Sequence, residues 1–231
     1  MHRVPLRYLD TKSPYTLAVS TASGTGLTSD DEQVSIPYNF LATQVWPSSR
    51  TAAIVIEKYL STQNVSKPVV ICEFGCGPGL PSVTAALCHE NCYAIATDID
   101  QLALELVGQA AMEQNVSSRV ETLTFDLVLN ATTSTIPHAD IYIFSDVFES
   151  AMVAKGAAQI TYRLLKENAS SKIWVFAQSD RAQREFYLKE MQRSLQAPTL
   201  AWSQSLQPPD IICKEDRVWL CNIDETNVFY G

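Results

Sequence analysis

The segment Glu73–Leu80 has glycine at every second position of its centre. These glycines are Gly75, Gly77 and Gly79. Glycine lets the backbone turn tightly and approach a ligand where a Cβ would block it. The apolar run Val69–Phe74 precedes the segment and a helix-like run follows it, so the glycines are expected in a strand-to-helix turn. A ligand-binding turn is therefore predicted here, and a tight turn without a ligand is the alternative.

The acid in front of the glycines restricts the kind of ligand. Glu73 stands two positions before the first glycine, where it would repel a pyrophosphate but not the ammonium of a methionyl group. Leu80 stands where a dinucleotide fingerprint has its last glycine. Both features disfavour an NAD-dependent dehydrogenase.

A second acid, Asp98, follows the next apolar run, Cys92–Thr97. A carboxylate at a strand end, some 20 residues past a nucleotide-binding turn, can accept hydrogen bonds from both hydroxyls of a ribose. Asp100 lies two residues further on, and an N-cap of the following helix is its expected role. We predict that Asp98 holds a ribose.

The elements that must position these residues alternate along the chain. Strands are predicted at 69–74, 92–97, 120–125, 141–145 and 172–177, and helices at 46–63, 80–89, 100–115, 150–168 and 181–194. Two further strand-like runs, 199–205 and 218–223, have no long helix between them. This pattern predicts an α/β fold: a doubly wound, mostly parallel seven-stranded sheet with an antiparallel C-terminal edge hairpin.

Length and composition fit one domain. The chain has 231 residues, of which 46% are hydrophobic and 18% charged, enough for one α/β core. Residues 1–31 are rich in Ser, Thr and Gly, and we predict an irregular N-terminal arm there. A short strand is expected at 34–41, within a single domain that spans 32–231.

Charge and cysteine usage limit the partners and the compartment. The net charge of −8 disfavours nucleic acid and suits a protein or small-molecule partner. No apolar run is long enough to span a bilayer, and the first residues lack the apolar core of a secretion signal. Cys88 and Cys92 lack a second ligand pair, so no metal site is predicted. We expect a cytoplasmic or nuclear monomer that does not bind membranes.

Together the motifs resemble the class I, seven-β-strand S-adenosylmethionine-dependent methyltransferases. The resemblance lies in the Glu-x-Gly-x-Gly-x-Gly turn and the acid after the second strand. Further matches resemble one branch, the protein-lysine methyltransferase-like family sometimes called family sixteen: Val45-Trp46-Pro47-Ser48-Ser49, Gly79-Leu80-Pro81 and Ser145-Asp146-Val147. The resemblance covers about Phe40–Ala177. It implies a Rossmann-like methyltransferase fold and S-adenosyl-L-methionine as cofactor.

The resemblance also implies a role for each matching cofactor residue. The three glycines would approach the methionyl and ribose parts, and Glu73 would lie near the methionyl amine. Phe125 and Asp126 would lie near the adenine, since an aromatic face and a carboxylate suit the ring and its amine. A core position is an equal alternative for Phe125. Trp46 would close over the cofactor, with packing against the helix start as its alternative, and Ser145 would line the same site.

The acceptor side departs from the family pattern. The family shows Asp-x-x-Tyr after the fourth strand, whereas this chain has Asp146-Val147-Phe148-Glu149. An amine must be neutral when it attacks a sulfonium methyl, and Asp146 and Glu149 could orient it as catalytic residues. Both could instead be carboxylates favoured by a helix start. We hypothesise a methyltransferase that acts on protein lysine. The alternatives are a small-molecule methyltransferase and a non-catalytic scaffold that binds the cofactor.

Overall fold

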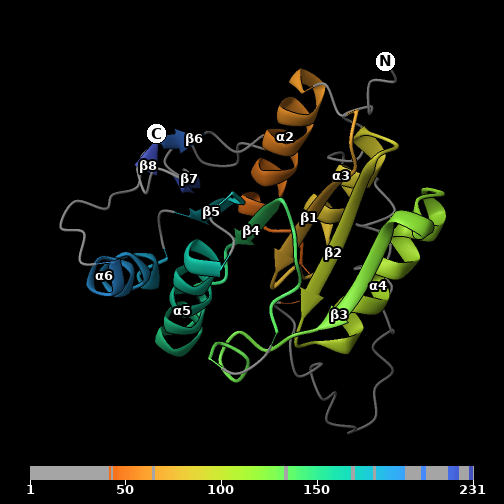
Figure 1. The fold of residues 1–231 in the computed structure, drawn as a ribbon. Coiled ribbons are helices and arrows are strands. Elements are labelled where there is room, and N and C mark those ends of the chain that lie inside the picture. The colour runs from red at the N-terminus through yellow and green to blue at the C-terminus, as the bar shows by residue number, and fades with distance from the viewer. Residues whose placement is uncertain are drawn as a thin grey trace, which may run out of the picture.

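The computed structural model describes residues 42, 44–63, 66–132, 135–167, 170–178 and 181–195. It also describes the backbone of three short segments, 204–206, 218–223 and 229–230. The predicted arm at 1–31 and the predicted strand at 34–41 lie outside the described residues. Figure 1 shows a twisted central sheet with helices on both of its faces.

Five parallel strands form the part of the sheet that carries the site. They are β1 (Val69–Phe74), β2 (Cys92–Asp98), β3 (Val120–Thr124), β4 (Ile141–Ser145) and β5 (Lys172–Gln178), in the order β3-β2-β1-β4-β5. Each lies within one residue of its predicted bounds. The predicted Rossmann-like α/β fold is confirmed for these strands.

Beyond β5 the pairing becomes antiparallel. The strand β7 (Val218–Ile223) pairs with β5, with β6 (Gln204–Leu206) and with β8 (Phe229–Tyr230). The link between β6 and β7 and most of the predicted strand at 199–205 lie outside the described residues. The predicted seven-stranded sheet with its edge hairpin therefore stays a prediction.

The helices cover the sheet in two layers (Figure 1). One layer holds α2 (Pro47–Thr62), α3 (Leu80–Cys88) and α4 (Gln101–Glu113), and the other holds α5 (Ala151–Glu167) and α6 (Gln183–Leu195). Side chains of each strand alternate between the layers, as the pleat requires. Phe74 and Phe144 pack in the cluster that includes α5 and α6, whereas Ile143 and Phe176 pack in the cluster with α2. Both faces of the central strands β1, β4 and β5 are therefore mostly buried, which explains their continuous apolar runs in the sequence.

The order of the strands reverses between β1 and β4. The chain runs outward from β1 to β2 and β3 on one side, then crosses to β4 and β5 on the other. A crevice beyond the carboxyl ends of the strands is expected at such a switch point.

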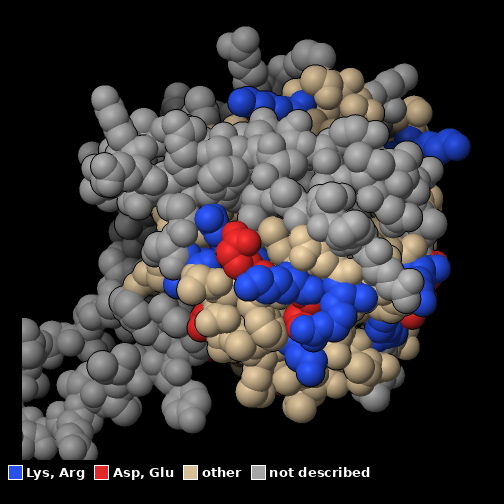
Figure 2. Space-filling model, turned by 90° about the vertical axis from the view of Figure 1, so that its left-hand side faces the viewer, with Lys and Arg blue, Asp and Glu red and all other residues tan. Residues whose placement is uncertain are grey.

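Charge is distributed unevenly over the surface. Figure 2 shows Lys and Arg side chains gathered on the side of the molecule that carries α6. On α5 and α6 these are Lys155, Arg163, Lys166, Arg184, Lys189 and Arg193. Acids on the same helices pair with some of them, for example Glu190 with Arg193. Within the part of the chain described, no helix has the length and hydropathy needed to cross a membrane.

Candidate functional site

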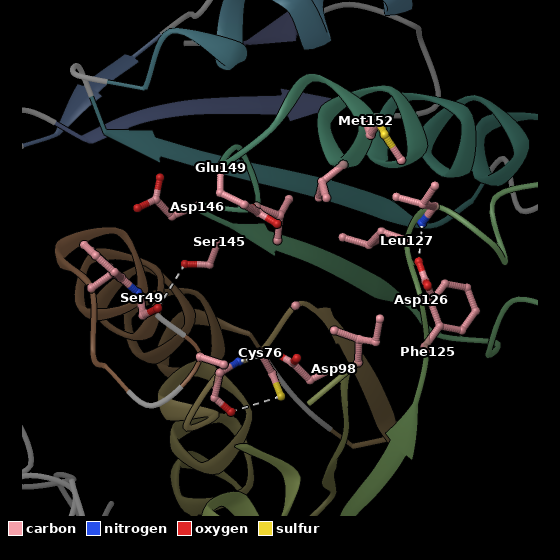
Figure 3. Close-up of a pocket in the computed structure, with 18 of the residues that line it drawn as sticks. Ser49, Cys76, Asp98, Phe125, Asp126, Leu127, Ser145, Asp146, Glu149 and Met152 are labelled. Carbon is pink, nitrogen blue, oxygen red and sulfur yellow. Dashed lines mark hydrogen bonds between the residues drawn. The ribbon is translucent and has the colours of Figure 1, made fainter. Parts of the chain in front are cut away.

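A cavity of about 460 Å³ lies at the carboxyl ends of β1, β2 and β4. Its lining brings together most of the residues predicted from sequence: Trp46, Gly75, Gly77, Asp98, Phe125, Asp126, Ser145, Asp146 and Glu149. Figure 3 shows that the labelled residues, such as Asp98 and Ser145, come from the ends of several strands, with Ser49 of α2 beside them. Two predicted residues, Glu73 and Gly79, do not belong to the lining.

The glycine loop forms the floor of the cavity between β1 and α3. Gly75 and Gly77 have φ angles of +61° and +52°, a left-handed conformation that favours glycine. A Cβ on Gly77 would lie 3.1 Å from the carbonyl oxygen of Ala42. The Cys76 N–H donates to the Thr97 carbonyl at 2.9 Å and ties the loop to β2. The loop therefore offers bare backbone to whatever occupies the cavity.

Gly79 serves the packing of helices instead of the cavity. It is the N-cap of α3, and a Cβ there would lie 2.5 Å from Cγ2 of Val107 in α4. Its side chain is absent because α4 packs closely against this turn. Gly79 thus has a packing role between α3 and α4, and its expected cofactor contact stays a prediction.

Glu73 lies in the core behind the loop. Its Oε2 accepts from the Ser82 hydroxyl at 2.6 Å and from the Ser82 N–H at 3.1 Å, so it ties β1 to the first turns of α3. Its Oε1 has no partner among the described residues. Burial raises the pKa of Glu73 to about 8, against the lowering effect of the Ser82 hydrogen bonds. This position supports the loop and lies outside the cavity lining, and the expected contact of Glu73 with the methionyl amine stays a prediction.

Asp98 lies at the tip of β2 and lines the cavity with 7% of its surface exposed. Its Oδ2 accepts from the Gly77 N–H at 2.8 Å and its Oδ1 from the Asp100 N–H at 2.9 Å. Burial raises the pKa of Asp98, and these backbone hydrogen bonds oppose the rise. Each carboxylate oxygen has a second lone pair that can accept a hydroxyl.

Asp100 performs the helix-capping role expected of it. Its Oδ1 accepts from the Leu102 N–H at 2.9 Å at the N-cap of α4. It does not belong to the cavity lining. The predicted cap at Asp100 is confirmed, and the ribose contact expected of Asp98 stays a prediction.

The segment after β3 forms another wall. Phe125 lines the cavity and also packs on Phe74, with ring centroids 5.2 Å apart, so it belongs to both the core and the lining. Asp126 Oδ1 accepts from the Val128 N–H at 2.7 Å and from the Leu129 N–H at 3.1 Å. The Asp126 carboxylate therefore holds the turn that continues this wall.

The turn after β4 carries the two predicted catalytic acids. The Asp146 side chain is 0% exposed, and its carboxylate accepts from Gln178 Nε2 at 2.6 Å and from Arg181 Nε and Nη2 at 3.1 Å each. Glu149 lines the cavity and is exposed to solvent. Partial desolvation raises the pKa of Glu149, and its own backbone N–H and Arg181 oppose the rise.

Trp46 and Arg181 join two distant segments at the cavity. Arg181 Cζ lies 4.8 Å from the centroid of the Trp46 ring, and both residues line the cavity. The Ser145 hydroxyl donates to Oγ of Ser49 in α2 at 3.3 Å. Trp46 thus lies at the helix start and lines the cavity, and its expected closure over the cofactor stays a prediction.

Sequence reasoning missed several lining residues. Arg181 follows the fifth strand, and the rule that ligands lie beyond strand ends is a signal that could have found it. Three apolar side chains at the cavity are well exposed: Ile99 at 60%, Leu129 at 73% and Met152 at 66%. Their exposure depends on the tertiary structure and has no signal in the sequence.

The family model of lysine methyltransferases matches residues 37–194. The chain belongs to this family. This membership and the fold make the chain a class I S-adenosylmethionine-dependent methyltransferase-like protein, as the motifs predicted. No curated protein sequence matches the chain significantly.

Solved structures support the fold at low sequence identity. A human methyltransferase 10 domain-containing protein is 13% identical, with a TM-score of 0.56 over 79% of this chain and 84% of that chain. A candidate O-methyltransferase from Nostoc punctiforme is 16% identical, with a TM-score of 0.51 over 90% and 67%. The chain spans about half of a third structure, YjhP from E. coli, at 18% identity and a TM-score of 0.44 over 58% and 51%.

S-adenosyl-L-methionine is the cofactor that this family of methyltransferases implies. The cavity residues fit it. Gly77 leaves a space that a Cβ would enter, and Asp98 offers carboxylate oxygens at the tip of β2. Phe125 adds an aromatic wall, which suits a purine. Among the described residues, no cluster of His, Cys, Asp and Glu suits a metal ion.

Proposed function

We propose that this chain transfers the methyl group of S-adenosyl-L-methionine to a lysine side chain of a protein substrate. The observation that carries the proposal is the cavity itself. One continuous lining joins the glycine loop and Asp98 to the turn that bears Asp146 and Glu149. A methyl donor held at the first group of residues would have its acceptor at the second.

The cofactor side would hold each part of the donor with a different group. The Asp98 carboxylate would accept from the ribose hydroxyls, and the backbone of Gly75 and Gly77 would lie along the methionyl part. Phe125 and the turn held by Asp126 would enclose the adenine. When bound, the cofactor supplies an electrophilic methyl group on its sulfonium. The task of the protein is therefore to align the acceptor and to manage its proton.

The acceptor side favours a cationic group. Glu149 is an exposed acid at this end of the cavity, whereas the charge of Asp146 is paired with Arg181. A lysine ammonium would be attracted there and must lose a proton before it attacks, which a nearby carboxylate assists. The family description supports lysine as the acceptor. The fold does not select the acceptor, since one similar structure is described as an O-methyltransferase candidate.

The proposal includes the wider setting. We expect a monomer in the cytoplasm or nucleus with a protein partner, without nucleic acid or membrane. We also propose that β6 and β7 form the edge hairpin of a seven-stranded sheet, which their antiparallel pairing supports.

Two measurements test the proposed function. Isothermal titration with S-adenosylmethionine and S-adenosylhomocysteine should give a micromolar dissociation constant, on the order of −8 kcal/mol. Labelled S-adenosylmethionine with a cell lysate should place label in protein, and acid hydrolysis should release it as methylated lysine.

The results separate the alternatives. Absence of both heat and a thermal shift at millimolar ligand would overturn the assignment. Label in the small-molecule fraction would indicate a small-molecule methyltransferase. Binding without any transfer would indicate a non-catalytic scaffold.

A further inference from the structure

The Asp146 carboxylate is engaged inside the protein. Both of its oxygens accept hydrogen bonds, one from Arg181 and the other from Arg181 and Gln178, at 2.6–3.1 Å. Its side chain is 0% exposed. A buried carboxylate in a fork-like contact with a guanidinium is a strong, directional pair. An acceptor amine could reach it only by displacing Arg181.

The backbone turns Asp146 toward the end of β5. Its φ is +64°, a conformation that Asp adopts more readily than most residues, and its N–H donates to the Phe176 carbonyl at 2.9 Å. Figure 3 shows the Asp146 carboxylate pointing away from Asp98 and Phe125. This orientation aims the side chain at the segment that carries Gln178 and Arg181.

Arg181 is the residue toward which the Asp146 carboxylate points. Its guanidinium lies over the Trp46 ring at 4.8 Å, so one side chain connects the end of β4, the segment after β5 and the start of α2. A guanidinium over an indole is a favourable cation–π contact. Arg181 also acts electrostatically on Glu149, the exposed acid of the same turn.

We propose that Asp146 is a positioning residue, which holds Arg181 against Trp46 and so leaves Glu149 as the carboxylate that receives the methyl acceptor. The inference rests on the proposed function for the role of Glu149 only. If Asp146 lost its charge, the guanidinium would turn toward Glu149. A bound guanidinium there would compete with a cationic acceptor.

The first test needs no acceptor. The emission of Trp46 is obtained as the difference between each protein and the same protein with Trp46→Phe, which removes the signal of the other tryptophans. Asp146→Asn should change this difference spectrum as much as Arg181→Met does, and the double variant should add nothing further. An unchanged Trp46 spectrum in Asp146→Asn would overturn the proposal.

A matched control lies at the other end of β4. Asp140 is exposed, and its carboxylate accepts from the Val70 N–H at 2.8 Å, away from the cavity lining. Asp140→Asn makes the same chemical change and should leave the Trp46 spectrum as in the parent. A change of equal size in this control would mean that the signal does not report the Arg181 contact, and the proposal would lose its support.

The second test uses labelled S-adenosylmethionine with lysate protein as the acceptor. Asp146→Asn should lower the rate of incorporation about tenfold, and Asp146→Asn with Arg181→Met should restore it to within about threefold of the parent. Glu149→Gln should give a low rate of incorporation both in the parent and in the double variant. A double variant as slow as Asp146→Asn alone would show that Asp146 contacts the acceptor directly and would overturn the inference.

Cofactor binding distinguishes failure of the proposed function from failure of the inference about Asp146. The variants at Asp146, Arg181 and Glu149 that keep Trp46 should bind S-adenosylhomocysteine within about threefold of the parent, and circular dichroism should show an intact fold. If the parent itself does not bind S-adenosylhomocysteine, the proposed function fails, whereas the Trp46 spectra still test the position of Arg181.

Discussion

The two ends of the cavity are built by different means. On the cofactor side, the decisive contacts use backbone groups of neighbouring strand ends, such as the Gly77 N–H on Asp98, which is 21 residues away. On the acceptor side they join side chains from distant segments, since Arg181 lies 35 residues from Asp146. A site that is formed by backbone groups depends on a few glycines. A site that is formed by side chains changes when any one of those residues is substituted.

This difference explains where the chain departs from its family. The glycine loop and the acid after β2 match the family pattern residue by residue. The departure, Glu149 in place of the expected tyrosine, lies on the acceptor side. All members of the family use the same methyl donor, so the residues that bind it are expected to stay the same. The residues on the acceptor side can differ without changing how the donor is bound.

The largest expected effect is at the backbone of the cofactor side. Gly77→Val places a branched side chain at φ +52°, with its Cβ 3.1 Å from the Ala42 carbonyl oxygen, in the wall of the proposed cofactor cavity. We expect no measurable S-adenosylmethionine binding by titration. Gly108→Ala in α4 is the control, since nothing lies within 4 Å of its added Cβ. A folded Gly77→Val protein with normal affinity would place the cofactor elsewhere.

Glu73, which lies in the core behind the glycine loop, should make the stability of the fold depend on pH. The pKa of Glu73 is about 8 in the folded protein, above the ordinary value of 4.5, because burial disfavours the charged form. The unfolded chain therefore releases its proton first. The contribution of Glu73 to the free energy of unfolding is fully present below about pH 4.5. It declines as the pH rises to about 8, by at most about 1.4 kcal/mol per pH unit.

Glu73→Gln mimics the protonated form and should remove this slope. Urea unfolding between about pH 5 and 8 measures it. The exposed Glu113 in α4 provides a matched control, and Glu113→Gln should keep the slope of the parent. Equal slopes for Glu73→Gln and the parent would mean that Glu73 is ionised in the core.

Two acids on the cofactor side should respond differently. Asp98→Ala removes charge-assisted hydrogen bonds to the ribose and should weaken cofactor binding tenfold or more. Asp100→Ala removes only the cap of α4, at about 1 kcal/mol of stability, and should leave the affinity unchanged. Titration and thermal melts of both variants measure the two effects. The reverse pattern would assign the ribose to Asp100.

The smallest effect is expected where the two sides meet. Ser145 donates to Ser49 at 3.3 Å, a long and therefore weak hydrogen bond. Ser145→Ala should change cofactor affinity less than about threefold and stability by less than about 1 kcal/mol. A larger loss of affinity, measured by titration, would show that the Ser145 hydroxyl binds the cofactor directly and would blur the division between the sides.

Periodicity was sufficient for the parallel core. The bounds of β1 and β4 were predicted to the residue, because a strand covered on both faces is a continuous apolar run between breakers. The glycine loop was also predictable, since the left-handed turns at Gly75 and Gly77 favour glycine. Glu73 and Gly79 share this motif, but the motif cannot show which members face the cavity.

The sequence by itself determined the α/β fold, the loop between β1 and α3, the place of Asp98 at the end of β2 and the cap at Asp100, because each depends on local geometry or on a regular spacing. Only the tertiary structure decided that Asp146 is held by Arg181, that Arg181 lies over Trp46, and that Glu149 is the more exposed acid. Those contacts join segments that are adjacent only after β4 and β5 pair and α2 packs on the sheet. No spacing along the chain encodes them, since they depend on how complete elements pack.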